Sequence, residues 1–171
     1  MVTGSLVSSL QGEPRSTHDI DIVIALPESA IKNFVAAFPA PEYYLPEAGI
    51  VAALKEQSMF NLIDVQEGGK VDFWILTLDP FDQSRFSRKY GEDFLGLKIQ
   101  VSRPEDTILA KLKWAKLSGG SEKQFLDALR VYEVQSGKLD LAYLNEWVKK
   151  MGLESLWKRL TEEAEAMIPP G

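Results

Sequence analysis

The hydrophobic positions of this chain follow two different periods, and the change falls near residue 101. Before it, short runs alternate between apolar and polar residues, or are apolar throughout, as β-strands are. The clearest runs are Asp19–Leu26, Met59–Val65, Val71–Leu76 and Leu97–Val101. After it, apolar residues recur every three or four positions, which is the period of a helix face. The pattern predicts an α+β protein, with a first domain at residues 1–101 and a C-terminal helical region at residues 102–171.

Helices are also expected between the strands of the first domain. Pro27 opens one of them in its first turn, and an apolar stripe gives this helix a buried face. The stripe consists of Ile31, Phe34, Val35 and Phe38. A shorter helix is predicted at Pro46–Lys55, and Asp79 caps a further segment that runs to Tyr90.

The C-terminal region is predicted to be a helical bundle that packs on the first domain. It starts at Pro104, where a proline followed by Glu105 and Asp106 is typical of a helix N-terminus. Glycines divide the remainder into three further amphipathic segments. These are Glu122–Gln135, Leu141–Met151 and Leu153–Met167.

Asp19 and Asp21 are the most informative polar residues. Side chains alternate along a strand, so the two carboxylates leave one face of the sheet together, roughly 6–7 Å apart at Cα. A third acid, Asp72, lies in another strand-like run, where Lys70 and Trp74 are predicted to share its face. Neighbouring carboxylates repel each other, and a bound cation relieves that repulsion. Mg²⁺ suits them because it takes one or two carboxylates and fills its other positions with water and phosphate oxygens.

A glycine and a serine near the start of the chain add a candidate phosphate site. Gly4 and Ser5 follow a short β-prone segment and precede residues 6–10, which can form the first turns of a helix. Glycine lets the backbone approach a phosphate, and a helix N-terminus offers free N–H groups to an anion. Together with the three acids, this pair describes a site for metal-assisted nucleotidyl transfer.

These residues resemble the polymerase-β-like nucleotidyltransferase superfamily. Gly4-Ser5 is followed after thirteen residues by Asp19-Ile20-Asp21, and Asp72 lies further on in Lys70-Val-Asp72-Phe. Arg15-x-Thr17-x-Asp19-Ile-Asp21 is similar to the small prokaryotic branch that includes AbiEii-type toxins and MNT-like antitoxins. The stretch from Ser102 to Leu112 and the acidic position Asp127 extend the resemblance over nearly the whole chain.

The resemblance implies a mixed sheet flanked by helices and a catalytic metal triad of Asp19, Asp21 and Asp72. These acids would hold two Mg²⁺ ions, or Mn²⁺ in their place. It also implies nucleoside triphosphate (NTP) binding near Gly4 and Ser5. Relatives usually carry a helix and a fuller first strand ahead of that pair, so either the first strand is short here or the true start lies upstream of Met1.

Four further residues are candidate nucleotide contacts, each with a structural alternative. Arg15 would contact phosphate or the acidic cluster, or would lie in a solvated turn. Thr17 would be a ligand of the nucleotide, or its hydroxyl would support the turn into the strand. Lys70 would touch substrate or pair with Asp72. Lys111 would reach the triphosphate, as in the resembled family, or extend its charge to solvent from an apolar helix face.

The reaction expected from this set is transfer of a nucleoside monophosphate (NMP) from an NTP to a hydroxyl, with release of pyrophosphate. RNA, a protein or a small alcohol would serve equally as acceptor, and neither the preferred base nor the oligomeric state follows from the sequence. The alternative is an antitoxin-like binding module of a toxin–antitoxin or phage-defence system, which keeps the fold but does little chemistry.

The amino-acid composition disfavours several other classes of protein and of functional site. At 171 residues and 45% hydrophobic, the chain can bury one good core with a helical appendage. It has no cysteine and a single histidine, His18, so disulfide frameworks, zinc–cysteine sites and histidine triads are disfavoured. No apolar run is long enough for a membrane span, and no signal-peptide pattern opens the chain, so a cytoplasmic protein is expected. The net charge of −6 disfavours a broadly basic nucleic-acid surface.

Overall fold

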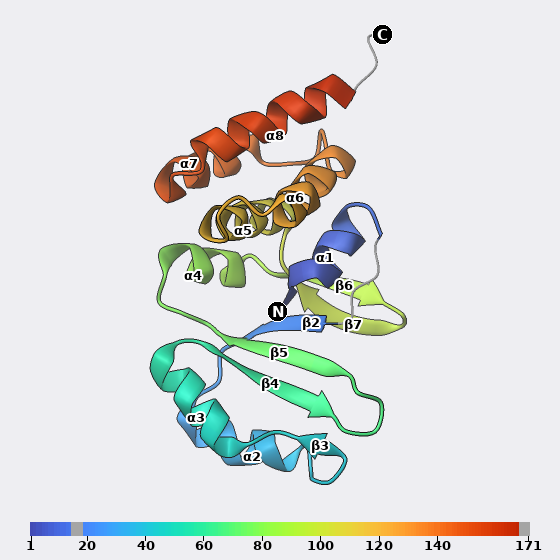
Figure 1. Ribbon diagram of the computed structural model, residues 1–171, viewed down its shortest axis with the longest axis vertical. Coiled ribbons are helices and arrows are strands. Elements are labelled where there is room, and N and C mark those ends of the chain that lie inside the picture. Colours follow the sequence, from blue (N-terminus) through green and yellow to red (C-terminus); the bar gives the residue numbers. More distant parts are fainter. Residues whose placement is uncertain (15–18, 168–171) are drawn as a thin grey trace. The chain divides into compact units, whose positions relative to one another are not determined.

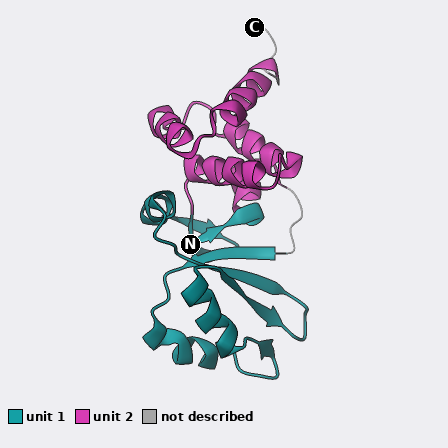
Figure 2. Cartoon of the chain, turned by 60° about the vertical axis from the view of Figure 1, so that its left-hand side comes forward, with its two compact units in different colours: residues 1–6, 16–101 teal, residues 7–15, 102–171 magenta. Residues whose placement is uncertain are grey.

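The computed structural model describes residues 1–14 and 19–167 (Figure 1). The chain divides into two compact units, which are coloured separately in Figure 2. Unit 1 comprises residues 1–6 and 16–101, and unit 2 comprises residues 7–15 and 102–171. Residues 7–15 were predicted as part of the first domain, whereas in the structure they group with the C-terminal helices. Hydrogen bonds between distant parts of the chain contribute to this grouping: the Gln11 side chain donates to the Ser102 carbonyl (2.6 Å), and the Gln135 side chain donates to the Gln11 carbonyl (2.7 Å).

Unit 1 is built on a mixed sheet. In the described part of the chain, seven strands follow the order β3-β4-β5-β2-β1-β7-β6. Their bounds are β1 Val2–Thr3, β2 Asp19–Ile24, β3 Tyr43–Tyr44, β4 Met59–Asp64, β5 Lys70–Ile75, β6 Tyr90–Phe94 and β7 Leu97–Val101. β2 runs parallel to β5, whereas β4 is antiparallel to β5 and β1 is antiparallel to β2. The predicted α+β class is therefore confirmed.

Four of these strands match the predicted runs to within two residues, but β3 and β6 were not predicted. β6 pairs with β7 through a turn at Leu95 and Gly96, which both have positive φ (52° and 80°). A two-residue hairpin turn needs such angles, and Asn-Gly or Asp-Gly is the sequence that usually signals it. Leucine at the first turn position gave no such signal.

One face of the sheet carries the apolar core of unit 1. The helices on this face are α2 (Ile31–Ala36), which follows a 3₁₀ turn at Glu28–Ala30, and α3 (Glu47–Glu56). Phe73 lies in the middle of this core, where its ring stacks on Phe60 at 5.2 Å and meets Phe34 edge-on at 5.3 Å. Further buried members of the cluster are Ile31, Leu45, Ile50, Ala53, Leu62 and Ile75. Helices that cover this face leave the polar positions of β2 and β5 on the opposite face.

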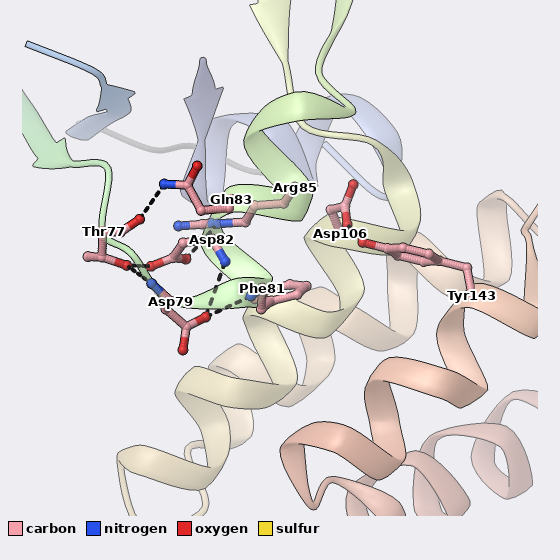
Figure 3. A network of polar contacts seen from close by, with 8 residues as sticks. All are labelled: Thr77, Asp79, Phe81, Asp82, Gln83, Arg85, Asp106 and Tyr143. Atoms are coloured by element: carbon pink, nitrogen blue, oxygen red, sulfur yellow. Dashed lines mark hydrogen bonds and ion pairs between the residues drawn. The ribbon is translucent and has the colours of Figure 1, made fainter.

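The segment after β5 is held by side-chain caps (Figure 3). Asp79 accepts hydrogen bonds from the backbone N–H groups of Phe81 (2.9 Å) and Asp82 (3.2 Å), as an N-cap of α4 (Pro80–Ser87). Asp82 in turn accepts from the Thr77 hydroxyl (2.5 Å) and from Arg85 (2.9 Å). The predicted cap is therefore confirmed, although the helix ends at Ser87 and Tyr90 already belongs to β6.

Unit 2 is helical, as predicted for residues after 101. Its helices are α5 Pro104–Leu117, α6 Glu122–Val134, α7 Leu141–Met151 and α8 Glu154–Met167, and it includes the residues of α1 (Gly4–Gln11) from Val7 onward. Fully buried side chains such as Leu112, Phe125 and Leu160 form its core. At the start of α5, the Tyr143 hydroxyl donates to the buried Asp106 carboxylate at 2.6 Å (Figure 3). None of the helices in the described residues is long and apolar enough to cross a membrane.

Candidate active site

The pairing of β2 with β5 gathers the polar side chains of unit 1. In this parallel pair Asp21 lies opposite Asp72, and Asp19 lies opposite Lys70. Residues that are Cα partners in adjacent strands project to the same side of a sheet. The strand register therefore places Asp19, Asp21 and Asp72 on one face of the sheet, as the two-residue alternation predicted. Their neighbours Ile22, Ile24 and Phe73 pack into the apolar core on the other face.

Two neighbouring strands extend this polar face. β4 places Asn61 opposite Asp72, and β1 places Thr3 opposite Asp21. Thr3 and Asp72 are each only 8% exposed, whereas Asp19 is exposed and Asp21 is half-buried. The acids therefore lie along a gradient of burial, with Asp72 inside and Asp19 at the outer end of β2.

Gly4 has a structural reason to be glycine in this site. Its φ is +71°, and a Cβ at this position would overlap the carboxylate of Asp21. An L-residue would therefore meet both backbone strain and a steric clash. The backbone at the start of α1 consequently lies against Asp21, with Ser5 as the next residue. The helix expected after this pair is present, and it begins at Gly4 itself (α1, Gly4–Gln11).

Asp72 and Asp21 both accept hydrogen bonds from side chains of the same polar face. Asn61 donates its side-chain amide to Asp72 Oδ1, and Lys70 Nζ donates to Asp72 Oδ2 at 3.1 Å. Trp74 donates its indole N–H to Asp21 Oδ1 at 3.0 Å. These bonds fix the orientation of the two carboxylates on the polar face.

Lys70 lies between two of the acids. Its ammonium is 3.1 Å from Asp72 Oδ2 and 3.6 Å from Asp19 Oδ1. The hydrogen bond to Asp72 is the largest cause that raises the pKa of Lys70 above its ordinary value, and the negative charges of Asp72 and Asp19 act in the same direction. Of the two interpretations offered for Lys70, pairing with Asp72 is the one that the structure contains.

The donor set suits a hard cation, although the side chains do not converge on one point as they stand. Within residues 1–14 and 19–167, no three histidine or acidic side chains form a group that could hold one ion. Asp19 and Asp21 nevertheless offer carboxylate oxygens on one strand face, the ligand type that Mg²⁺ and Mn²⁺ prefer. A Cβ at Gly4 would overlap Asp21 Oδ2, so the carboxylate itself fills the space beside this glycine. A divalent ion at Asp19 and Asp21 therefore stays a prediction, as does the full metal triad.

The other predicted nucleotide contacts are not gathered by these strands. Arg15 and Thr17 lie outside the described residues. Lys111 belongs to α5 in unit 2, where it is buried and donates to Asp127 Oδ2 at 2.7 Å. One interpretation of the sequence was that Lys111 extends its charge to solvent, and the buried position of the side chain does not agree with it. Its contact with a nucleotide stays a prediction.

Asn61 and Trp74 are site residues that the sequence analysis did not assign. Asn61 is a polar residue between the apolar Phe60 and Leu62 of β4, and this interruption is a signal that the sequence carries. Trp74 was predicted on the same face as Asp72. Its hydrogen bond to Asp21 crosses from β5 to β2, so no local pattern in the sequence indicates it.

Comparisons with known proteins add little to this description. No family model matches the sequence, and no curated protein matches it. Among solved structures, one that matches is the crystal structure of an antigenic nucleotidyltransferase-like protein from Paracoccidioides brasiliensis. It is 17% identical in sequence, the match covers 92% of this chain and 83% of that chain, and the TM-score is 0.44. The function of this chain is therefore inferred from its own residues.

Proposed function

We propose that this chain is a metal-dependent nucleotidyltransferase, which moves an NMP from an NTP to a hydroxyl acceptor and releases pyrophosphate. The observation that carries the proposal is the pairing of Asp21 with Asp72 in adjacent strands, beside the glycine backbone at the start of α1. The reaction needs a site for cations and a site for phosphates. Carboxylates on a sheet face and the N-terminus of a helix supply these two sites in one place.

The residues divide the work by their chemistry. Gly4 and Ser5 hold the terminal phosphates of the NTP with backbone N–H groups, and Asp19, Asp21 and Asp72 are the ligands for divalent metal. When bound, Mg²⁺ or Mn²⁺ neutralises the triphosphate and lowers the pKa of the acceptor hydroxyl. Arg15, Thr17 and Lys111 remain candidate contacts to the nucleotide.

The transfer itself is an in-line displacement at the α-phosphorus. The acceptor oxygen forms a bond to phosphorus, the bond to the pyrophosphate oxygen breaks, and Asp72 takes the hydroxyl proton. Asp72 is suited to this because Asn61 and Lys70 fix its orientation while its oxygens keep spare lone pairs. Positioning and charge stabilisation supply most of the rate enhancement.

Labelled nucleotides test the proposal. The protein is incubated with Mg²⁺, cell extract and each of four NTPs labelled at the α-phosphate, and label is sought on RNA, protein and small molecules. We expect transfer by the wild type, and a loss of at least about a hundredfold in Asp19→Asn and Asp21→Asn, because removing a ligand charge weakens the cation site. Glu56→Gln is the matched control, since it removes the same charge from an exposed position on α3. Equal transfer by wild type and Asp21→Asn would contradict the proposal.

The second candidate is a binding module related to the antitoxin-like branch. One observation favours it: Lys70, Asn61 and Trp74 of the protein itself donate hydrogen bonds to Asp72 and Asp21. Calorimetry with Mg²⁺ and each NTP separates the two functions. Metal-dependent nucleotide binding supports the enzyme, whereas its absence, with normal folding, supports the binding module.

A further inference from the structure

Asn61 lies beside the proposed base, Asp72, and the strand around it fixes it there. The two residues are Cα partners in the antiparallel pair of β4 and β5. The sequence neighbours Phe60 and Leu62 are buried in the apolar core of unit 1, so the alternation of the strand directs Asn61 to the polar face. Asparagine is depleted in strands, and here it puts a half-buried amide next to a buried acid.

The amide group of Asn61 has one end engaged and one end open. A carboxylate accepts hydrogen bonds, so the amide atom that bonds to Asp72 Oδ1 is the donor Nδ2. The carbonyl Oδ1 of Asn61 is attached to the same carbon as Nδ2, and it therefore lies beside the carboxylate. Within residues 1–14 and 19–167, no hydrogen bond is formed to this oxygen.

Two oxygen atoms that accept hydrogen bonds consequently stand side by side on the polar face. Asp72 Oδ1 keeps a lone pair besides the one that Asn61 uses, and Asn61 Oδ1 is an uncharged acceptor next to it. Orientation of Asp72 alone requires only a donor, which Lys70 also supplies at 3.1 Å. What asparagine adds is the second acceptor. Two adjacent acceptors match two adjacent O–H donors, which is the pattern of a vicinal diol.

We propose that the hydroxyl substrate is a vicinal diol, and that Asn61 Oδ1 accepts a hydrogen bond from the hydroxyl next to the one that reacts. The reacting hydroxyl gives its proton to Asp72, and its oxygen bonds to the α-phosphorus as pyrophosphate leaves. The second hydroxyl keeps its proton. Asn61 is thus a specificity-determining residue, and the inference rests on the proposed function because it names the substrate class of the same site.

The 3′-terminal ribose of an RNA and a free sugar both carry this diol, whereas a serine or threonine side chain does not. Pairs of substrates that differ by one hydroxyl therefore test the inference. The first pair is a short oligoribonucleotide and the same oligonucleotide with a 2′-deoxy terminal residue. The second pair is methyl riboside and methyl 2-deoxyriboside.

Each substrate is incubated with the full chain, Mg²⁺ and the four NTPs labelled at the α-phosphate. We expect kcat/KM to be about tenfold higher or more for the diol of a pair, because its deoxy partner leaves Asn61 Oδ1 unpaired. The pair in which this preference is found identifies RNA or a free sugar as the source of the diol.

Two variants of Asn61 separate recognition of the diol from orientation of Asp72. Asn61→Leu removes both the donor and the acceptor, whereas Asn61→Asp keeps acceptor oxygens and loses the donor. Both should be slower than the wild type, because Asp72 loses a bond that orients it. The preference for the diol should fall to about onefold in Asn61→Leu and persist in Asn61→Asp, a difference that lost orientation alone does not produce.

Asn33→Leu is the matched control. Asn33 is exposed on α2, the helix whose Phe34 and Val35 pack on the apolar core, so this variant should keep the wild-type preference. Far-ultraviolet circular dichroism establishes that each variant is folded. The wild-type preference and the Asn61→Asp variant test the inference even if Asn61→Leu does not fold.

The outcomes that overturn the inference differ from those that overturn the proposed function. Equal use of a diol and its deoxy partner by the wild type, or transfer to protein hydroxyls alone, would refute diol recognition and leave nucleotidyl transfer intact. A preference that persists in folded Asn61→Leu, or is lost in folded Asn61→Asp, would remove Asn61 from this role. Absence of transfer to every substrate and to cell extract would overturn both proposals.

Discussion

Gly4 shows most directly how one residue shapes the candidate site. A side chain there would meet the carboxylate of Asp21, and the backbone has a positive φ that only glycine adopts without strain. Because glycine has no Cβ, the backbone at the start of α1 can lie close to the Asp21 carboxylate. The residue therefore matters for stability and, under the proposed function, for the phosphate position.

Gly4→Ala separates these two effects when it is compared with Gly68→Ala. The two glycines have nearly equal φ (+71° and +72°), but a Cβ at Gly68 meets nothing within 4 Å. Both variants should lose about 1–2 kcal/mol to backbone strain. Gly4→Ala should lose a further 1–3 kcal/mol or so, because Asp21 must move. Urea unfolding measures both, and equal losses would show that the contact with Asp21 is easily relieved.

At the scale of elements, the pairing of β2 with β5 decides the environment of each acid. The same strand face carries an exposed Asp19 and a buried Asp72, and only the buried one is held by both Asn61 and Lys70. From the sequence, all three acids were predicted to be metal ligands, with Asp72 also as the base. The strand register makes them unequal, because Asp72 is paired on both sides, with Asn61 and with Asp21, whereas the pairing of β1 on β2 covers Ile22 and Asp21.

This inequality predicts different stabilities for two alanine variants in metal-free buffer. Asp72→Ala should lose about 1–3 kcal/mol, because it removes the acceptor of the Asn61 amide and the nearer of the two carboxylates that contact Lys70. Asp19→Ala should change stability by about 0–1 kcal/mol, since its contact with Lys70 is longer and largely exposed. Chemical denaturation in the presence of a chelator measures both. A more stable Asp72→Ala would mean that repulsion among the acids outweighs their hydrogen bonds.

At the scale of the whole molecule, the chain forms two compact units with different kinds of core. Unit 1 buries aromatic and aliphatic side chains between helices and a sheet, and unit 2 buries a helical core. Unit 2 also contains the ion pair of Lys111 with Asp127, whose side chains are 6% and 9% exposed. The resemblance included both positions and gave Lys111 a contact with the nucleotide, and the burial of the pair gives both residues a structural role.

The buried pair should be sensitive to the loss of one partner. Lys111→Met leaves the Asp127 charge without its cation and should cost about 3–5 kcal/mol. The double variant Lys111→Met with Asp127→Leu should recover most of that loss, because an apolar pair of similar size fills the space. Lys158→Met removes an exposed partner of Glu162 and should cost less than about 0.5 kcal/mol. Thermal and urea unfolding, followed by the fluorescence of a unit 2 residue such as Trp157, would check the order of these stability losses.

The sequence by itself determined the local features. Two-residue alternation assigned Asp19, Asp21 and Asp72 to a polar strand face, and proline and aspartate signals located the starts of α4 and α5. These features depend on neighbours within a few residues, so a single chain carries enough information for them. The α+β class followed from the same periodicities.

Only the tertiary structure decided which distant residues meet. Strand order and register brought Asp21 opposite Asp72, placed Lys70 between two acids, and gave Asn61 and Trp74 their acceptors. It also drew residues 7–15 into unit 2 and buried Lys111 with Asp127. Pairing between strands fifty residues apart is settled by packing and hydrogen bonding over the whole sheet, and no local period encodes it.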